Sequence, residues 1–150
     1  MKATKALDYK RELNISEDAD KKEFLGDITS FYNTDGRCII FGIEEKKDEN
    51  GHNTGIPEKI VAIPDENEDK LFQKIEDLIR SNTETNIAFV ISHIEDIKGD
   101  KVLVLGIPKG LGLPAMVTFN DSNRFYRRKN TGKYLVDVFE LNDMFMKIRC

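Results

Sequence analysis

The spacing of apolar and polar residues near the N-terminus predicts a strand followed by a helix. Leu7 and Tyr9 alternate with Asp8 and Lys10, which is typical of a short strand with one face buried. Apolar side chains then recur at helical spacing, which predicts a helix from about Asp20 to Tyr32. Turn-forming residues follow and end that helix.

A continuous apolar run, Cys38 to Ile43, comes next and predicts a central strand covered on both faces. The following segment, Glu44 to Pro57, is a polar connection that turns at Asn50-Gly51. Beyond it the pattern predicts strands at 60–63, 87–94, 101–107, 115–119 and 124–128, with a hairpin turn at Lys98-Gly99-Asp100. Two more helices are expected: one after Pro64-Asp65 with the apolar stripe Leu71, Phe72, Ile75, Leu78 and Ile79, and one that starts near Asp137 and packs Val138, Leu141 and Phe145 inward.

Helices separate some of these strands, while hairpins join others. This order favours an α/β (α+β) fold in which about three helices pack against a mixed β-sheet. With 150 residues the chain has the size of one domain, and we expect a single domain over residues 1–150.

The composition is that of a soluble globular protein, with 39% hydrophobic and 33% charged residues. We expect a cytoplasmic protein without a membrane partner, because the sequence contains neither a secretory signal nor an apolar run of about 20 residues. Cys38 and Cys150 form neither a disulfide framework nor a metal cluster. The net charge of −4 counts against indiscriminate binding of nucleic acid, so any such function requires a local basic surface.

One late segment concentrates positive charge. From Arg124 to Lys133 the chain carries five cations and no acid. In a strand, Arg124, Tyr126 and Arg128 would face one way and Arg127 the other. Arginine forks fit phosphate oxygens, and a tyrosine ring can stack on an unpaired base. The same pattern also fits a solvated edge strand whose charges prevent aggregation.

The turn Asn33-Thr34-Asp35-Gly36 has two interpretations. It can be a helix stop in which Gly36 adopts a positive φ. It can also be a loop at the rim of the sheet that presents polar groups to a ligand.

Four acids near predicted strand ends are candidates for a metal-dependent nuclease, because paired carboxylates hold Mg²⁺ and activate water. They are Asp8, Glu12, Glu44 and Glu45. Acids at strand ends are common, however, and a purely structural role is the simpler interpretation.

Other candidate sites are poorly supported. His52 and His93 have no neighbouring ligand set and are expected at the surface. Gly110-Leu111-Gly112 lacks the Gly-Lys-Ser/Thr sequence of a phosphate-binding loop.

Taken in order, several segments resemble the Schlafen AlbA-like domain family, described as DNA-binding and sometimes as a divergent AAA-type ATP-binding domain. Leu7 to Lys10 is similar to the family's opening Glu-Phe-Lys strand, Ile28 to Gly36 to its Ser-Ala-Phe-Ala-Asn-Thr-x-Gly-Gly segment, and Ile39 to Glu45 to its Ile-Gly-Val-Asp-Asp strand. Gly55-Ile56, Pro114-Ala115 and the segment Phe125 to Arg128 resemble its later Gly-Val or Gly-Ile, Pro-Tyr and Tyr-Tyr-x-Arg pieces.

The resemblance implies a mixed α/β domain that binds nucleic acid, found in bacterial regulators and in the RNA-cleaving core of animal Schlafen proteins. Of the three nuclease acids in those animal proteins, Asp8 matches the second and Glu44 or Glu45 the third. The first falls at Ala3, which cannot bind a metal ion. Arg37 stands where the family prefers a second glycine. Because the animal proteins pair two similar lobes, the resemblance also allows a homodimer.

Our hypothesis from the sequence is a regulatory module that binds DNA or RNA through phosphate contacts and needs no cofactor. The candidate contacts are Lys10, Arg37, Arg124, Tyr126, Arg127, Arg128, Lys129 and Lys133, beside the turn Asn33, Thr34, Asp35 and Gly36. The alternatives are an endoribonuclease that uses Asp8, Glu44 or Glu45 with Mg²⁺ or Mn²⁺, and a module that binds ATP or another protein.

Overall fold

The computed structural model describes residues 7–84, 87 and 90–147. Ala3, Cys150 and part of the strand expected at 87–94 therefore lie outside the described residues. The helices are α1 (Asp18–Tyr32), α2 (Glu68–Ser81) and α3 (Val138–Met146). The strands are β1 (Leu7–Lys10), β2 (Arg37–Phe41), β3 (Ile43–Lys47), β4 (Asn53–Ile60), β5 (Thr83–Glu84), β6 (Ile91–Ile97), β7 (Asp100–Ile107), β8 (Met116–Val117), β9 (Tyr126–Lys129) and β10 (Gly132–Leu135).

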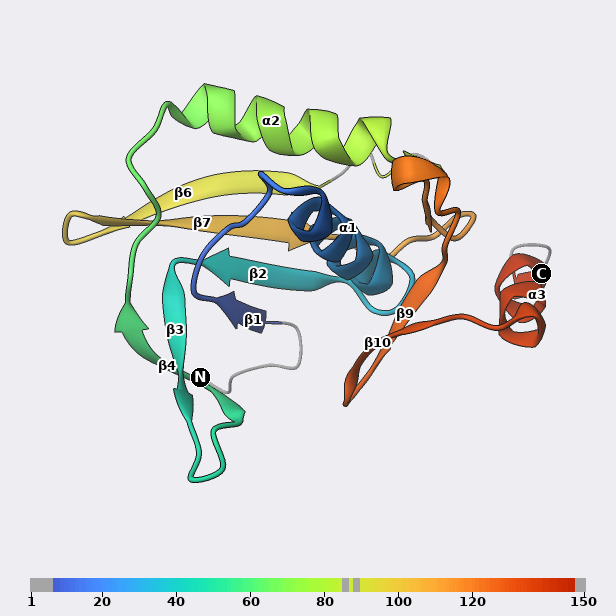
Figure 1. Ribbon diagram of the computed structural model, residues 1–150, viewed down its shortest axis with the longest axis horizontal. Coiled ribbons are helices and arrows are strands. Elements are labelled where there is room, and N and C mark those ends of the chain that lie inside the picture. Colours follow the sequence, from blue (N-terminus) through green and yellow to red (C-terminus); the bar gives the residue numbers. More distant parts are fainter. Residues whose placement is uncertain (1–6, 85–86, 88–89, 148–150) are drawn as a thin grey trace.

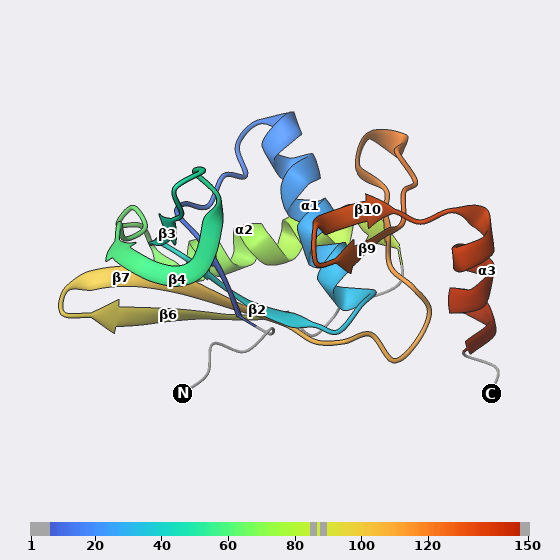
Figure 2. The same ribbon diagram turned by 90° about the horizontal axis from the view of Figure 1, so that it is seen from below.

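Four strands form the main sheet, in the order β1-β2-β7-β6. The β1–β2 pair is parallel, whereas β2–β7 and β7–β6 are antiparallel, so the sheet is mixed. Both α1 and α2 lie on one face of this sheet (Figures 1 and 2). The expected α+β class, with three helices and a mixed sheet, is confirmed.

Burial along β2 shows that only one sheet face is covered. Ile39 and Phe41 are buried under the helices, whereas Cys38 and Ile40 are half-buried on the opposite face. The prediction of a strand covered on both faces was wrong, because the chain has no helix for the second face among its described residues. Burial also raises the pKa of the Cys38 thiol.

The apolar run beginning at Cys38 does not form one strand. Gly42 has a φ of +107°, a left-handed conformation that favours glycine, and here the chain leaves the sheet. The next residues form β3, which pairs with β4 in an antiparallel hairpin. This hairpin replaces the expected polar connection, and the strand expected at 60–63 was wrong because β4 ends at Ile60.

The core lies between the sheet and its two helices. The stripe Leu71, Ile75 and Ile79 of α2 is buried at the spacing that the sequence predicts. Asn67 caps this helix, since its Oδ1 accepts a hydrogen bond from the amide of Lys70 at 3.0 Å. In contrast, α1 is buried on almost all sides from Phe24 to Phe31, because the β9–β10 hairpin covers the side that the sheet does not.

The C-terminal part differs most from the expectation. Strand β10 was not predicted, and it pairs with β9. Helix α3 does start after Asp137, which caps it by accepting from the amide of Glu140 at 2.8 Å. Phe145 packs edge-on against Phe125, but Val138 is exposed, so its predicted inward packing was wrong. None of the described helices is long and apolar enough to cross a membrane.

Candidate nucleic-acid interface

Strand β1 lies between the β3–β4 hairpin and the β9–β10 hairpin (Figure 1). Residues of all three line a groove that runs along β1. It consists of two adjoining cavities of about 510 and 740 Å³. We call them the arginine cavity, which lies beside Arg37 and Lys129, and the hairpin cavity, which reaches Lys47 on β3. Asp8 and Arg128 line both cavities and so mark their junction.

Arg128 is held at this junction by α1. Its Nη1 donates to Oδ1 of Asp27 at 3.2 Å and to the Ser30 hydroxyl at 3.3 Å. Its guanidinium also lies over the Phe31 ring, 4.1 Å from the centroid. A guanidinium has five donors in a fixed fork, so the bonds to α1 leave others available to the groove.

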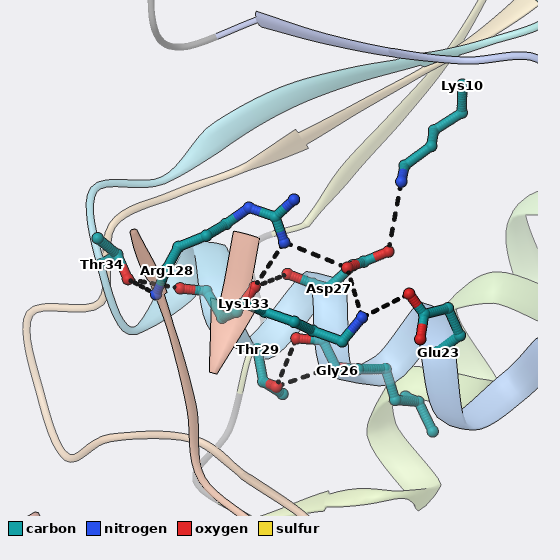
Figure 3. A network of polar contacts seen from close by, with 10 residues as sticks. Lys10, Glu23, Gly26, Asp27, Thr29, Thr34, Arg128 and Lys133 are labelled. Atoms are coloured by element: carbon teal, nitrogen blue, oxygen red, sulfur yellow. Dashed lines mark hydrogen bonds and ion pairs between the residues drawn. The ribbon is translucent and has the colours of Figure 1, made fainter. Parts of the chain in front are cut away.

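Asp27 is the centre of a larger polar network (Figure 3). Asp27 is only 7% exposed to solvent. Besides Arg128, it pairs with Lys133 at 3.1 Å and with Lys10 at 3.7 Å. Burial lowers the pKa of the Lys133 ammonium, but its bonds to Glu23 and Asp27 more than offset this, so that pKa is raised overall. Lys133 therefore attaches β10 to α1 and does not line the groove.

Arg37 contributes a second guanidinium to the arginine cavity. It lies 5.2 Å from the centroid of the same Phe31 ring that Arg128 covers. Its Nε atom is buried, and it has no hydrogen-bond partner among the described residues. A buried donor without a partner is costly, so Arg37 is kept at this cavity at some expense of stability.

The remaining late cations divide into paired and unpaired groups. Arg127 donates to Glu140 of α3 at 2.9 Å and to the carbonyl oxygen of Asn33 at 3.1 Å. In the part of the chain that the structure describes, Arg124 and Lys129 have no carboxylate partner. Lys129 lines the arginine cavity, with its Nζ 4.5 Å from the Tyr134 ring centroid, while Arg124 lines neither cavity.

Three of the five late cations, Arg127, Arg128 and Lys133, are each paired with a carboxylate. The acids come from α1 and α3, which flank the hairpin, and the sequence of the strand gave no sign of them. Tyr126 also differs from the expectation, because its ring packs against the core.

The turn after α1 is mainly structural. The Asn33 side chain donates to the carbonyl oxygens of Ala115 and Tyr126, both at 2.9 Å, and accepts from the Ala115 amide at 2.8 Å. The Thr34 hydroxyl donates to the backbone carbonyl oxygen of Ser30 and accepts from the backbone amide of Arg128 at 3.0 Å. Both side chains thus fix β9 against α1, although they also border cavities.

Gly36 has a steric reason to be glycine. Its φ is +76°, and a Cβ at this position would lie 2.7 Å from the amide nitrogen of Lys109. The predicted positive φ is confirmed, and Gly36 lets the loop after β7 pass close to the end of α1. Asp35 next to it is exposed and pairs weakly with Lys109, 3.9 Å away.

The candidate acids converge on the hairpin cavity. Asp8, Glu44 and Glu45 all line it, whereas Glu12 does not. Burial, and then repulsion from Asp8, raise the pKa of the Glu45 carboxyl. Within the described residues, however, no group of three histidine, cysteine, aspartate or glutamate side chains is placed to hold a metal ion. His52 and His93 are exposed, as expected.

Sequence reasoning missed two cations of the hairpin cavity, Arg11 and Lys47. Arg11 directly follows the cation of β1 that was predicted. Lys47 belongs to the hairpin that was taken for a polar connection, so its place opposite β1 could not be inferred. Arg11 lies 3.9 Å from Glu44, a pair exposed enough to contribute little.

The molecule has an α+β fold with a mixed sheet. A groove rich in cations lies along the edge strand β1, between two hairpins. The chain belongs to the Schlafen AlbA_2 family, because the model of that family matches residues 4–137. Membership in this family points to a nucleic-acid-related role.

One solved structure shares the fold at low sequence identity. The DIP2311 protein from Corynebacterium diphtheriae matches 88% of this chain with a TM-score of 0.58 and 17% identity. This chain spans 22% of that chain's length. The N-terminal domain of a protein from Nitrosomonas europaea, described as related to the ATP-dependent DNA helicase RecG, has a TM-score of 0.48 and 17% identity, with 72% of this chain and 71% of that one covered. No curated protein matches the chain.

Proposed function

We propose that this chain binds nucleic acid in a regulatory role, by holding the sugar-phosphate backbone in the groove along β1. The observation that carries the proposal is the collection of cations in two adjoining cavities of an acidic molecule. These cations are Lys10, Arg11, Arg37, Lys47, Arg128 and Lys129, against the acids Asp8, Asp35, Glu44 and Glu45. Cations outnumber acids along the groove although the molecule has a net charge of −4, and two of these cations, Lys10 and Arg128, also pair with Asp27 behind it.

The proposal moves the expected contact surface from one strand to several. Arg128 and Lys129 stay in it because they line the groove, whereas Arg124, Arg127 and Lys133 line neither of its two cavities. In the proposed contact surface their place is taken by cations from three other strands: Lys10 of β1, Arg37 of β2 and Lys47 of β3. Phosphate contacts of this kind give affinity for DNA or RNA without choice of base sequence.

A salt series tests this proposal. The double variant Lys47→Ala, Lys129→Ala removes two exposed groove cations that have no carboxylate partner in the described structure. We expect weaker binding of both DNA and RNA oligonucleotides, and a salt slope that flattens by about 0.7–0.9 per lost contact. The matched control is Lys70→Ala, Lys74→Ala on the exposed side of α2, which removes the same charge. Equal losses in both double variants would show that only net charge matters.

A second candidate is a metal-dependent endoribonuclease, favoured by the presence of Asp8, Glu44 and Glu45 in one cavity. Because no group of three described acids or histidines is placed to hold a metal, the arrangement fits only an ion bound by one or two carboxylates and completed by substrate phosphates. Mg²⁺- or Mn²⁺-dependent cleavage of structured RNA that is lost in Asp8→Asn, and kept in the surface control Glu66→Gln, would support it. RNA that stays intact with either metal removes this candidate.

A further inference from the structure

A third cavity continues the groove beyond the arginine cavity. It has a volume of about 310 Å³ and shares Thr34 and Asp35 with the arginine cavity. It lies between the end of α1, the loop after β7 and α3. We call it the Tyr32 cavity, after the aromatic side chain in its wall.

The lining of the Tyr32 cavity combines apolar surface with positive charge. Leu111 and Leu113 provide apolar surface, and Lys109 and Lys147 provide cations. The ring of Tyr32 forms part of the wall, although it also packs against the core. Leu111 is 92% exposed and Leu113 is 49% exposed, so this loop presents apolar surface to solvent. The arginine cavity is different, because guanidinium groups lie over its one aromatic ring.

The apolar wall is held in a fixed position. The amide of Gly110 donates to the carbonyl oxygen of Tyr32 at 2.8 Å. A Cβ on Gly110 would lie 2.5 Å from the Tyr32 ring, so the loop can approach the ring this closely only with glycine at that position. The surface beside Tyr32 therefore needs little rearrangement to receive a flat ligand.

We propose that the Tyr32 cavity receives an unpaired base of a single strand whose phosphates lie in the groove. This inference rests on the proposed function and narrows it to single-stranded nucleic acid. A nucleotide has a charged phosphate and an apolar base face, and the two neighbouring cavities match these two parts. In a duplex the base faces are stacked on one another and cannot enter such a cavity.

The test separates base contact from phosphate contact. The variant Leu111→Ser, Leu113→Ser removes apolar surface without changing charge, and both side chains are exposed enough to keep the fold. We expect affinity for a single-stranded oligonucleotide to fall about fivefold to tenfold, with an unchanged salt slope and unchanged duplex affinity. Lys109→Ala is expected to flatten the salt slope instead. Ile91→Ser on β6 is the matched apolar control and should have no effect.

The outcomes distinguish the two proposals. If the wild-type protein binds neither single strands nor duplexes, the proposed function fails and the inference fails with it. If it binds both and the double leucine variant loses neither, or loses both equally, only the base cavity is overturned. A 2-aminopurine placed at successive positions of the strand gives a second readout: its fluorescence should change on binding at one position, and that change should be absent in the variant.

Discussion

Arg128 donates from Nη1 to Oδ1 of Asp27 across 3.2 Å, although 101 residues separate them in the sequence. Lys133 uses the same oxygen at 3.1 Å. One buried carboxylate on α1 therefore holds cations from both strands of the β9–β10 hairpin. The same contact fixes the arginine that lies at the junction of the two groove cavities, so stability and the candidate binding surface are coupled at this residue.

Replacing the central acid should be strongly destabilising. In Asp27→Ala, Arg128 and Lys133 lose their shared partner inside a largely buried network, and breaking a buried pair costs about 3–5 kcal/mol. Asp35→Ala is the control, because its pair with Lys109 is exposed and should contribute less than about 1 kcal/mol. Urea unfolding of both variants measures the difference. Similar free energies of unfolding would contradict the central role of Asp27.

Glycine at position 36 should be needed for space as well as for backbone conformation. Gly36 and Gly51 have similar φ values of +76° and +80°, but only Gly36 has backbone atoms where a Cβ would be placed. We expect Gly51→Ala to cost about 1–2 kcal/mol from the left-handed conformation alone. Gly36→Ala should cost about 2 kcal/mol more because of the crowding. Thermal or urea unfolding checks the difference, and equal costs would show that the loop after β7 moves aside.

The pKa of Lys133 gives a prediction for alkaline pH. Its folded pKa is raised, so its stabilising contribution is complete below the unfolded pKa and is lost as pH rises through the folded pKa. In Glu23→Gln one cause of the raised pKa is gone, and the loss of unfolding free energy as the pH rises above the ordinary lysine pKa of 10.5 should be smaller than in the wild type.

Tyr134 must be controlled for, because burial and its bond to Glu140 raise its pKa too and its contribution is lost in the same direction. Tyr134→Phe, alone and combined with Glu23→Gln, separates the two groups. If Glu23→Gln has the same alkaline profile as the wild type in both backgrounds, Lys133 is not the group that titrates.

The elements that the sequence predicted well are those with a local signal. The stripe of α2 at Leu71, Ile75 and Ile79 repeats at helical spacing and is buried as expected. The hairpin at Lys98-Gly99 also formed, with both residues at positive φ. In both cases, neighbouring residues carry all the information that the structure uses.

The elements that were missed lack such a signal. Strand β4 is exposed throughout, so its residues show no alternation of apolar and polar positions. Gly42 divides an apolar run that looked continuous. For the site, Asp27 was hidden because an acid on a helix normally faces solvent, and its partners are distant in sequence. Most of the groove cations could be found from the sequence, but the place of Lys47 and the acids that pair with the cations depend on the tertiary fold.

The buried Nε of Arg37, which has no hydrogen-bond partner among the described residues, leads to a last prediction. Replacing Arg37 should not lower the stability of the free protein, but it should weaken anion binding. Two guanidinium groups, those of Arg37 and Arg128, also share the Phe31 ring. Arg37→Leu removes the unsatisfied donor, so the free protein should be as stable as the wild type or more stable by about 1 kcal/mol. Phosphate, titrated against chloride at equal ionic strength, should raise the Tm of the wild type through binding to the folded state. That rise should be reduced in Arg37→Leu and kept in Arg124→Leu, because Arg124 lies outside both groove cavities. An equal rise in all three proteins would show that the arginine cavity does not hold the anion.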